Sequence, residues 1–205
     1  MNNLIVSALQ RSAEVARLLS QSTEVTQTLE AVAEACIAAY RRGNKILLAG
    51  NGGSAADCQH IAGELVARFL FDRPGLSAIA LTVDTSVLTA IGNDYGYDTV
   101  FARQVQAIGA EGDVLLAYST SGGSKNILAA IDAARTKKMI VVGLTGLRES
   151  AMSTGRCDHV LRTPSTHTPH IQEGHLIMGH ILCQLIEQEL FAAERTVSKH
   201  GLLCE

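Results

Sequence analysis

Tryptophan is absent from this 205-residue sequence, and aromatic residues as a class make up only 4% of it. Small and aliphatic residues dominate instead, and apolar residues reach 47% of the chain. An apolar fraction this large excludes wholesale disorder. Aliphatic runs with few aromatic residues suit an α/β domain with buried parallel strands. The length fits one large domain better than two small ones.

Long apolar runs are also missing. The longest stretches hold about seven residues, which is too few to cross a bilayer. The N-terminal residues MNNLIVSALQRSAEV lack the charged-then-apolar order of a signal peptide. The five cysteines are odd in number, scattered, and without a Cys-x-x-Cys pair, so they read as reduced thiols rather than disulfides or zinc ligands. We therefore expect a cytoplasmic protein with no membrane partner.

Charge of either sign is modest. There are 17 basic and 20 acidic residues, with a formal net charge of −3. No segment gathers lysine or arginine into a stripe, which argues against a broad nucleic-acid surface. We expect no nucleic-acid partner.

The chain opens with two segments of helical periodicity, at residues 3–20 and 23–42. Thr23 is a plausible cap for the second helix and Gly43 a plausible stop. Their apolar stripes are broader than contact with one sheet face requires. Such a surplus is usually buried between subunits, so residues 1–43 are predicted to form a helical platform for oligomerisation.

Strands and helices then alternate. Buried strands are predicted at 45–50, 77–83, 113–119, 139–146 and 159–164, and helices at 54–69, 85–92, 98–109, 123–137, 148–154 and 170–191. This alternation predicts an α/β fold, a doubly wound five-stranded parallel sheet with two N-terminal helices and a long C-terminal helix. We expect one domain over residues 1–192, with an α/β core at 44–192 and a tail at 193–205.

Two predicted strands end in loops suited to a ligand, since ligands of open parallel sheets bind at the carboxyl ends of the strands. The first loop is Gly50-Asn51-Gly52-Gly53-Ser54, in which Ser54 can cap the next helix. The other is Ser119-Thr120-Ser121-Gly122-Gly123-Ser124. Four hydroxyls before a helix suit a phosphate group, although an ordinary Ser/Gly turn would look similar. Neither a P-loop nor a Gly-x-Gly-x-x-Gly motif is present, so a sugar phosphate is favoured over a nucleotide.

Two helices carry candidate catalytic or metal-binding groups. Steps of three and four residues place Asp57, His60, Glu64 and Arg68 on one helix face. A solvated polar face is the ordinary explanation, but His60 and Glu64 could also hold one metal ion together.

The last helix carries Gln172, Glu173, His175 and His180. Gln172 and His180 are separated by roughly 12 Å of rise and about 80° of rotation, so they reach one ion only by leaning together. His175 lies about 140° from His180 around the helix, so it cannot easily join the same site within one subunit. A packed or interface histidine is an equally good interpretation of this residue. Asn93-Asp94, placed in a turn after a helix, could form a local Asx bond or bind sugar hydroxyls.

These motifs together resemble the sugar isomerase (SIS) domain family and, within it, the family of phosphoheptose isomerases. The resemblance covers roughly residues 1–192. The motifs that carry it are GNGGSAAD (50–57), HIAGEL (60–65), GNDYGYD (92–98), GDVLLAYSTSGGS (112–124) and IQEGH…GH (171–180). Each motif alone is only suggestive, whereas the set is highly specific. The family fold is the flavodoxin-like SIS sheet.

The resemblance implies an aldose–ketose isomerase that converts sedoheptulose 7-phosphate to D-glycero-D-manno-heptose 7-phosphate, an early step toward the nucleotide-linked heptoses of surface glycans such as lipopolysaccharide. It implies that Glu64 and His180 are the catalytic pair. Substrate contacts are implied for Asn51, Gly52, Gly53, Glu64, Asn93, Asp94, Ser119, Thr120, Ser121, Ser124 and Gln172. One Zn²⁺ per subunit would be held by His60, Glu64, Gln172 and His180. A homotetramer with active sites at subunit interfaces is also implied.

The sequence departs from the family pattern at one loop, where Pro169-His170 stands in place of the Asp-Arg pair of some members. Two alternatives share the fold. One is a tetrameric scaffold of the DnaA-initiator-associating type, whose pattern lacks the glutamate and the histidine found here at Glu64 and His180. The other is a non-catalytic sugar-phosphate sensor, which needs the serine-rich loop but no acid–base pair.

Overall fold

A computed structural model describes residues 1–191 of the chain. Its elements, in order, are α1 (Asn2–Gln21), α2 (Thr23–Arg41), β1 (Ile46–Ala49), α3 (Gly53–Val66), β2 (Ala78–Ala80), α4 (Thr85–Tyr95), the 3₁₀ helix η1 (Tyr97–Thr99), α5 (Val100–Ile108), β3 (Val114–Tyr118), α6 (Lys125–Thr136), β4 (Ile140–Thr145), β5 (His159–Arg162) and α7 (Thr168–Phe191). The predicted tail at 193–205, with residue 192 of the predicted domain, lies outside the described residues.

The five strands form one parallel sheet in the order β2-β1-β3-β4-β5. This arrangement confirms the predicted doubly wound α/β fold. In register, Leu48 of β1 lies between Ala80 of β2 and Leu116 of β3. The chain moves outward from β1 to β2 and then returns to β3. The strand order therefore reverses between β1 and β3, and open α/β sheets bind ligands at such a reversal, outside the carboxyl ends of the strands.

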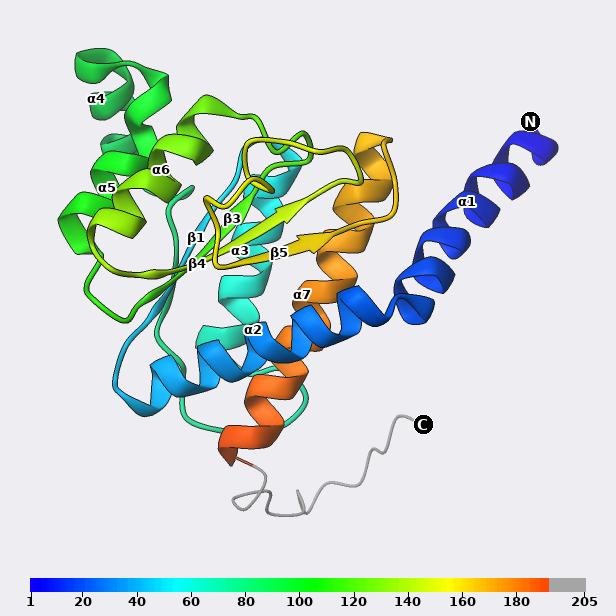
Figure 1. The fold of residues 1–205 in the computed structure, drawn as a ribbon, viewed down its shortest axis with the longest axis horizontal. Coiled ribbons are helices and arrows are strands. Elements are labelled where there is room, and N and C mark those ends of the chain that lie inside the picture. The colour runs from blue at the N-terminus through cyan, green and yellow to red at the C-terminus, as the bar shows by residue number, and fades with distance from the viewer. Residues whose placement is uncertain (192–205) are drawn as a thin grey trace.

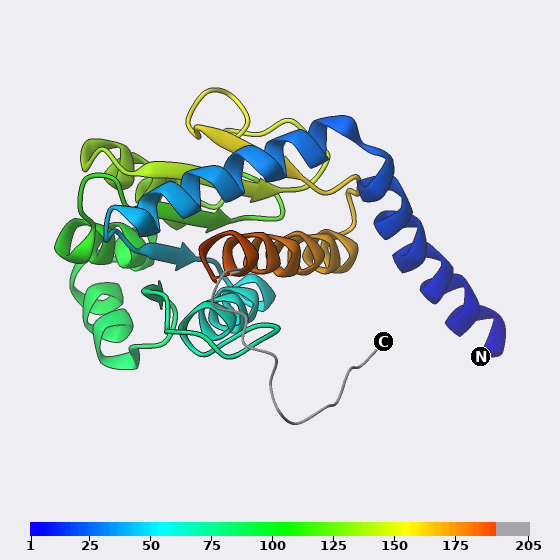
Figure 2. The same cartoon turned by 90° about the horizontal axis from the view of Figure 1, so that it is seen from below.

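The sheet has a helical layer on each face (Figures 1 and 2). Successive side chains of a strand point to opposite faces. Ile46 and Leu48 accordingly pack with α2, α3 and α7, whereas Leu47 and Ala49 pack with α5 and α6. Every residue of β1 and β3 is buried, which explains why both strands read as continuous apolar runs.

The two opening helices differ in how much they bury. Helix α2 packs across the sheet, while α1 projects away from the body of the molecule (Figures 1 and 2). Leu4 is 69% exposed and Leu9 is 66% exposed. In α1 only Val15 and Leu19 are buried. The chain as described thus leaves the outer half of an amphipathic helix without a covering surface.

Several local predictions are wrong at the helix ends. The cap of α2 is Ser22, whose hydroxyl accepts from the Val25 N–H, rather than Thr23. Gly52 takes the N-cap position of α3 without a side-chain bond, and Ser54 lies buried inside that helix instead of capping it. Gly43 does follow α2 in the left-handed conformation, with φ of 79°, as expected of a helix stop.

The predicted helix at 148–154 is also wrong, because this segment forms a series of turns. Ser153 donates its N–H to the Ser150 carbonyl, and its hydroxyl accepts from the Ser150 N–H. Serine side chains that bond to nearby backbone compete with helix formation. The Met152 N–H donates to the Gly122 carbonyl, and its side chain is fully buried. The segment therefore packs against the serine-rich loop after β3.

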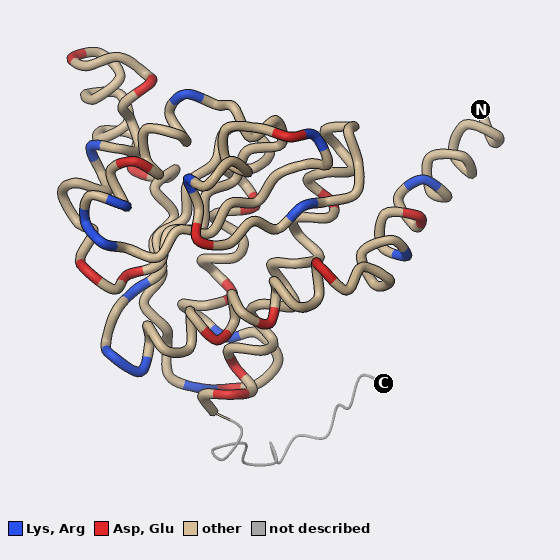
Figure 3. Tube along the Cα trace, in the orientation of Figure 1, with Lys and Arg blue, Asp and Glu red and all other residues tan. Residues whose placement is uncertain are grey.

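Within residues 1–191, no helix combines the length and the apolar character needed to cross a membrane. Lysine and arginine are spread over the described chain and interspersed with acidic positions, without a continuous basic stripe (Figure 3).

Candidate active site

The glycine-rich loop after β1 packs closely against its neighbours. A Cβ atom on Gly53 would lie 2.5 Å from Nε2 of Gln172, and one on Gly50 would lie 2.5 Å from the Ser54 carbonyl oxygen. Both distances are shorter than real Cβ contacts. At Gly50 the obstacle is backbone, so this position requires glycine, whereas at Gly53 a larger residue would displace the end of the Gln172 side chain. The start of α3 and the first turn of α7 therefore meet at Gly53, which brings the predicted site residues Gly53 and Gln172 together.

Asn51 is held by side chains that the sequence reasoning missed. Its amide and that of Asn126 form two reciprocal hydrogen bonds, of 2.9 and 2.8 Å. The Tyr97 hydroxyl donates to Asn51 Oδ1 at 3.2 Å. These bonds connect the loop after β1 to the first turn of α6 and to η1. Asn126 lies only two residues after Ser124 in the sequence, but its burial and its bonds to Asn51 are seen only in the structure.

The serine-rich loop after β3 ends at the N-terminus of α6. Ser119 and Ser124 lie with their hydroxyl oxygens 3.0 Å apart, and Ser121 Oγ accepts from the Gly123 N–H at 3.3 Å. Ser124 is the N-cap of α6, yet its side chain makes no capping bond. The first N–H groups of α6 are thus left without a side-chain acceptor, as is expected where a helix N-terminus binds an anion.

Glycine is required in this loop as well. Gly122 has φ of 64°, and a Cβ there would collide with the Ser150 side chain. Its carbonyl is the acceptor for Met152 described above. The turns that replace the expected helix at 148–154 therefore pack directly against this loop at Gly122.

Glu64, His60 and His180 converge from α3 and α7. One donor atom from each side chain lies within 4.8 Å of the other two. The Nε2 atoms of His60 and His180 are 2.7 Å apart, and His60 Nε2 is 3.4 Å from Glu64 Oε1. The steps of one helical turn on α3 and the contact between α3 and α7 together produce this cluster. It contains both residues predicted as the catalytic pair.

His180 lies in a partly desolvated environment between two rings. The Phe69 ring stacks on it with a centroid distance of 5.6 Å, and the His60 ring meets it edge-on at 5.0 Å. Burial lowers the pKa of His180, the neighbouring His60 lowers it further, and Glu64 acts in the opposite direction. The imidazole is therefore neutral near pH 7, and it can donate or accept a proton as its tautomer dictates.

The donor set of this cluster fits the predicted metal. Two imidazole nitrogens and a carboxylate oxygen are ligand types that Zn²⁺ prefers, and two Nε2 atoms so close cannot both carry a proton along the line between them. Gln172, the predicted fourth ligand, lies against Gly53. Within residues 1–191 the structure records no hydrogen bond from Gln172 to the other three. Its place as a ligand stays a prediction.

A buried ion pair supports the end of α3. Glu187 of α7 accepts from the N–H groups of Phe69 and Leu70, at 2.9 and 2.7 Å, and pairs with Arg73 Nε at 3.1 Å. Arg73 in turn donates to the carbonyl oxygens of Glu64 and Leu65. Both charged side chains are almost fully buried. The pair therefore holds the backbone of Glu64 and the ring that stacks on His180, and the sequence reasoning identified neither of its members.

The structure separates two other candidates from this cluster. His175 is fully buried, its ring donates through Nε2 to the Thr145 carbonyl at 3.2 Å, and burial lowers its pKa to about 4. His175 is therefore a packed core histidine and not a member of the cluster. Asn93 and Asp94 lie within α4 rather than in a turn after it. Both side chains are exposed and bond to each other at 2.7 Å.

Fold and site together define an α/β protein with a hydroxyl-rich loop and a helix N-terminus at the reversal point of a parallel sheet, and with an acid–base cluster between α3 and α7. The SIS domain family model matches residues 12–146. The chain is 56% identical over 190 residues to a phosphoheptose isomerase of Burkholderia pseudomallei strain K96243, covering 93% of this chain and 96% of that protein. It is 53% identical over 191 residues to one from Aneurinibacillus thermoaerophilus, with the same coverage.

A solved structure agrees with these sequence relatives. Phosphoheptose isomerase from Neisseria gonorrhoeae superposes with a TM-score of 0.85 at 38% identity, covering 91% of this chain and 98% of that one. The chain belongs to the SIS domain family and, within it, to the phosphoheptose isomerases, a family of enzymes. The resemblance found in the sequence motifs is thereby confirmed.

Proposed function

We propose that the protein isomerises sedoheptulose 7-phosphate to D-glycero-D-manno-heptose 7-phosphate through an enediol intermediate. The observation that carries this proposal is the convergence of Glu64 and His180 within 4.8 Å, on the two helices that meet near their N-termini at the loop after β1. The names of the relatives support the substrate class.

The reaction moves a proton between C1 and C2 of the sugar. It needs a base at the carbon, an acid at the oxygen, and stabilisation of the developing negative charge. Glu64 takes the proton from C1 of the ketose and delivers one to C2. His180, neutral and adjacent, donates to and accepts from the oxygens. The loop formed by Ser119, Thr120, Ser121 and Ser124 holds the phosphate end, which orients C1 and C2 over Glu64.

Zn²⁺ is part of this proposal, one ion per subunit, with His60, Glu64, Gln172 and His180 as its ligands. The supporting observation is the N/N/O donor cluster of the first, second and fourth of these residues. When bound, the ion would polarise the substrate carbonyl and stabilise the enediolate. Elemental analysis of the purified protein, paired with activity after chelation, tests this part. Full activity in metal-free protein would remove zinc from the mechanism.

The two alternative functions find no support. A scaffold of the initiator-associating type would not retain both Glu64 and His180. A sensor would need the serine-rich loop alone, whereas here α3 and α7 bring an acid–base pair together. The relatives reported above are named as isomerases.

We also propose that the working unit is a homotetramer in the cytoplasm that supplies heptose for surface glycans such as lipopolysaccharide. The exposed apolar residues of α1, among them Leu4, Ile5 and Leu9, support the assembly, since surplus apolar surface is usually covered by another subunit. A partner subunit could also place Asn93 and Asp94 beside the substrate. Light scattering tests the assembly, and a monomer mass would contradict it.

The experiment that tests the activity is incubation with sedoheptulose 7-phosphate, with products followed by NMR. We expect conversion to an aldose heptose 7-phosphate by the wild type. Unchanged substrate with the zinc-loaded, folded wild type would contradict the proposed function.

A further inference from the structure

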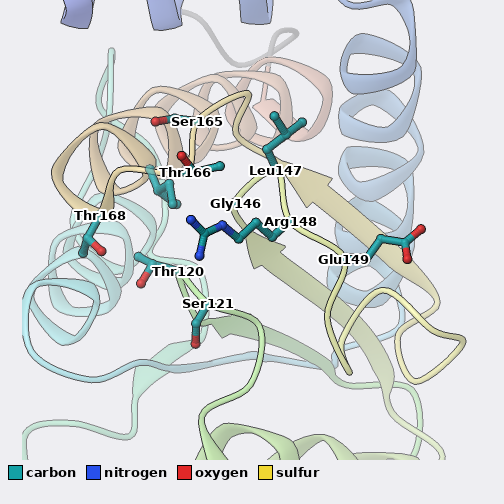
Figure 4. A pocket seen from close by; sticks show the side chains of 10 residues that line it. Thr120, Ser121, Gly146, Leu147, Arg148, Glu149, Ser165, Thr166 and Thr168 are labelled. Carbon is teal, nitrogen blue, oxygen red and sulfur yellow. The ribbon is translucent and has the colours of Figure 1, made fainter.

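A cavity of about 240 Å³ adjoins the serine-rich loop. Thr120 and Ser121 of that loop line one side of it, and Ser165, Thr166 and Thr168 line another. Figure 4 shows that these side chains come from the loop after β3, the loop after β5 and the start of α7. Five hydroxyl-bearing residues therefore line one open cavity that shares a wall with the predicted phosphate site.

Arg148 supplies the positive charge of this cavity. Its side chain extends among the hydroxyls toward Thr120, whereas Glu149 points the other way (Figure 4). Within residues 1–191 the structure records no hydrogen bond or ion pair for the Arg148 guanidinium. By contrast, Arg73 is paired with Glu187, and Arg156 with Asp132. Arg148 therefore has its donors available for a ligand.

The backbone holds Arg148 close to the serine-rich loop. The Gly146 N–H donates to the Thr120 carbonyl at 3.2 Å, and the Leu147 N–H donates to the Ser165 carbonyl at 2.9 Å. A Cβ on Gly146 would lie 3.0 Å from each of these two carbonyl oxygens, so the approach is close. Arg148 thus follows directly after two anchored residues, one tied to each wall of the cavity.

The serine-rich loop otherwise offers a phosphate dianion only neutral donors. Lys125 follows Ser124 in sequence, but its Nζ atom lies 3.9 Å from Asp98 Oδ2. A guanidinium binds phosphate through paired N–H donors that match the geometry of its oxygens. We propose that Arg148 binds the phosphate group of the substrate from the cavity side, together with Thr120 and Ser121. This inference rests on the proposed function and adds a substrate-binding residue to it.

The test compares Arg148→Ala, Arg148→Gln and Arg148→Lys with the wild type. For the first two we expect the KM for sedoheptulose 7-phosphate to rise about tenfold, the lower range for a hydrogen bond to a charged group. The value of kcat should change less than threefold, because Ser119, Thr120, Ser121 and Ser124 still hold the phosphate end in these variants. Competitive inhibition by inorganic phosphate should weaken by a similar factor. Arg148→Lys should recover part of the loss, since it keeps the charge without the paired donors.

Two control variants separate this role from damage to the loop. Arg156→Ala removes a neighbouring arginine that pairs with Asp132, and Lys125→Ala removes the other nearby cation. Neither should alter KM or phosphate inhibition. Unchanged phosphate inhibition in Arg148→Ala would overturn the inference even if KM rose, and so would an equal loss in Arg156→Ala. A larger loss in Lys125→Ala would assign the cation to Lys125 instead.

The inference can fail separately from the proposed function. If the wild type does not convert sedoheptulose 7-phosphate, the proposed function fails. A ³¹P NMR titration of the wild type and Arg148→Ala with inorganic phosphate then still decides the binding role. Weaker binding in the variant supports the role of Arg148, and equal binding contradicts it.

Discussion

Replacing Glu187 by alanine would leave a buried guanidinium without its counter-ion. Arg73 and Glu187 are both almost fully buried, with Nε and Oε1 at 3.1 Å. The same carboxylate accepts the N–H groups of Phe69 and Leu70, so these donors would lose their acceptor too. The perturbation therefore removes one charge partner and two backbone bonds at a single buried point.

The expected loss is large compared with the stability of a domain. Breaking a buried ion pair by removing one partner costs about 3–5 kcal/mol, and the typical free energy of unfolding is about 5–15 kcal/mol. The unpaired backbone donors raise the cost within this range rather than adding fully to it, because the three contacts share one side chain. We predict that Glu187→Ala lowers the free energy of unfolding by about 3–5 kcal/mol.

Urea denaturation followed by far-UV circular dichroism measures this loss, at equal protein concentrations because assembly shifts apparent stability. The matched control is Glu189→Ala. Glu189 pairs with Arg41 at 2.8 Å, but both side chains are more than half exposed, so its loss should cost less than about 1 kcal/mol. A Glu187→Ala variant no less stable than Glu189→Ala would refute the reasoning.

The same pair should affect turnover through position. Arg73 Nη2 donates to the Glu64 carbonyl at 2.8 Å, and Glu187 orders the backbone of Phe69, whose ring stacks on His180. The milder variant Glu187→Gln, assayed where it stays folded, should therefore lower kcat more than it raises KM. Asp113→Asn is the control, since Asp113 is equally buried but bonds Lys45 and Ala110 at the amino end of β3. Equal losses of kcat in both variants would indicate general destabilisation only.

Three further predictions concern single side chains. Glu64→Gln should lower kcat on the order of 100- to 10,000-fold while ³¹P NMR still detects phosphate binding, and near-wild-type turnover would rule out its role as base. Ser121→Ala should raise KM or lower kcat/KM, and an unchanged kcat/KM would move the phosphate site elsewhere. Burial lowers the pKa of His175 from 6.5 to about 4, so between these values the unfolded chain binds more protons and stability falls as the pH is lowered. Urea titrations should show about 2 kcal/mol less stability at pH 5 than at pH 7, and His175→Gln should lose that dependence.

The sheet could be predicted because its strands are buried on both faces. Every residue of β1 and β3 is enclosed by helices, so each strand reads as an apolar run. The predicted helix at 148–154 was wrong for two structural reasons. Ser150 and Ser153 bond to each other's backbone, and the Met152 side chain is buried in the core. Periodicity along the chain does not register such competition between local and tertiary contacts.

The candidate site was predictable where its residues share a helix face or a loop. His60 and Glu64 are one turn apart, and the serine-rich loop is contiguous in sequence. The supports of the site were not predictable, since Asn126, Arg73 and Glu187 act through partners between 8 and 118 residues away. The eight-residue separation of Gln172 and His180 argued against one common site. In the structure Gln172 contacts Gly53 while His180 contacts His60. The two residues of α7 therefore lie against different parts of α3.

The central claim is that Glu64 moves a proton between C1 and C2 of a heptose phosphate. Incubating the wild type with sedoheptulose 7-phosphate in D₂O and recording ¹H and ¹³C NMR spectra tests it most directly. The account predicts an aldose heptose 7-phosphate that carries deuterium at C2 in part of the molecules, because a proton held by a carboxylate can exchange with solvent before it is returned. Deuterium incorporation at C2 at the wild-type rate in Glu64→Gln would contradict the role of Glu64, and unchanged ketose with the wild type would contradict the activity itself.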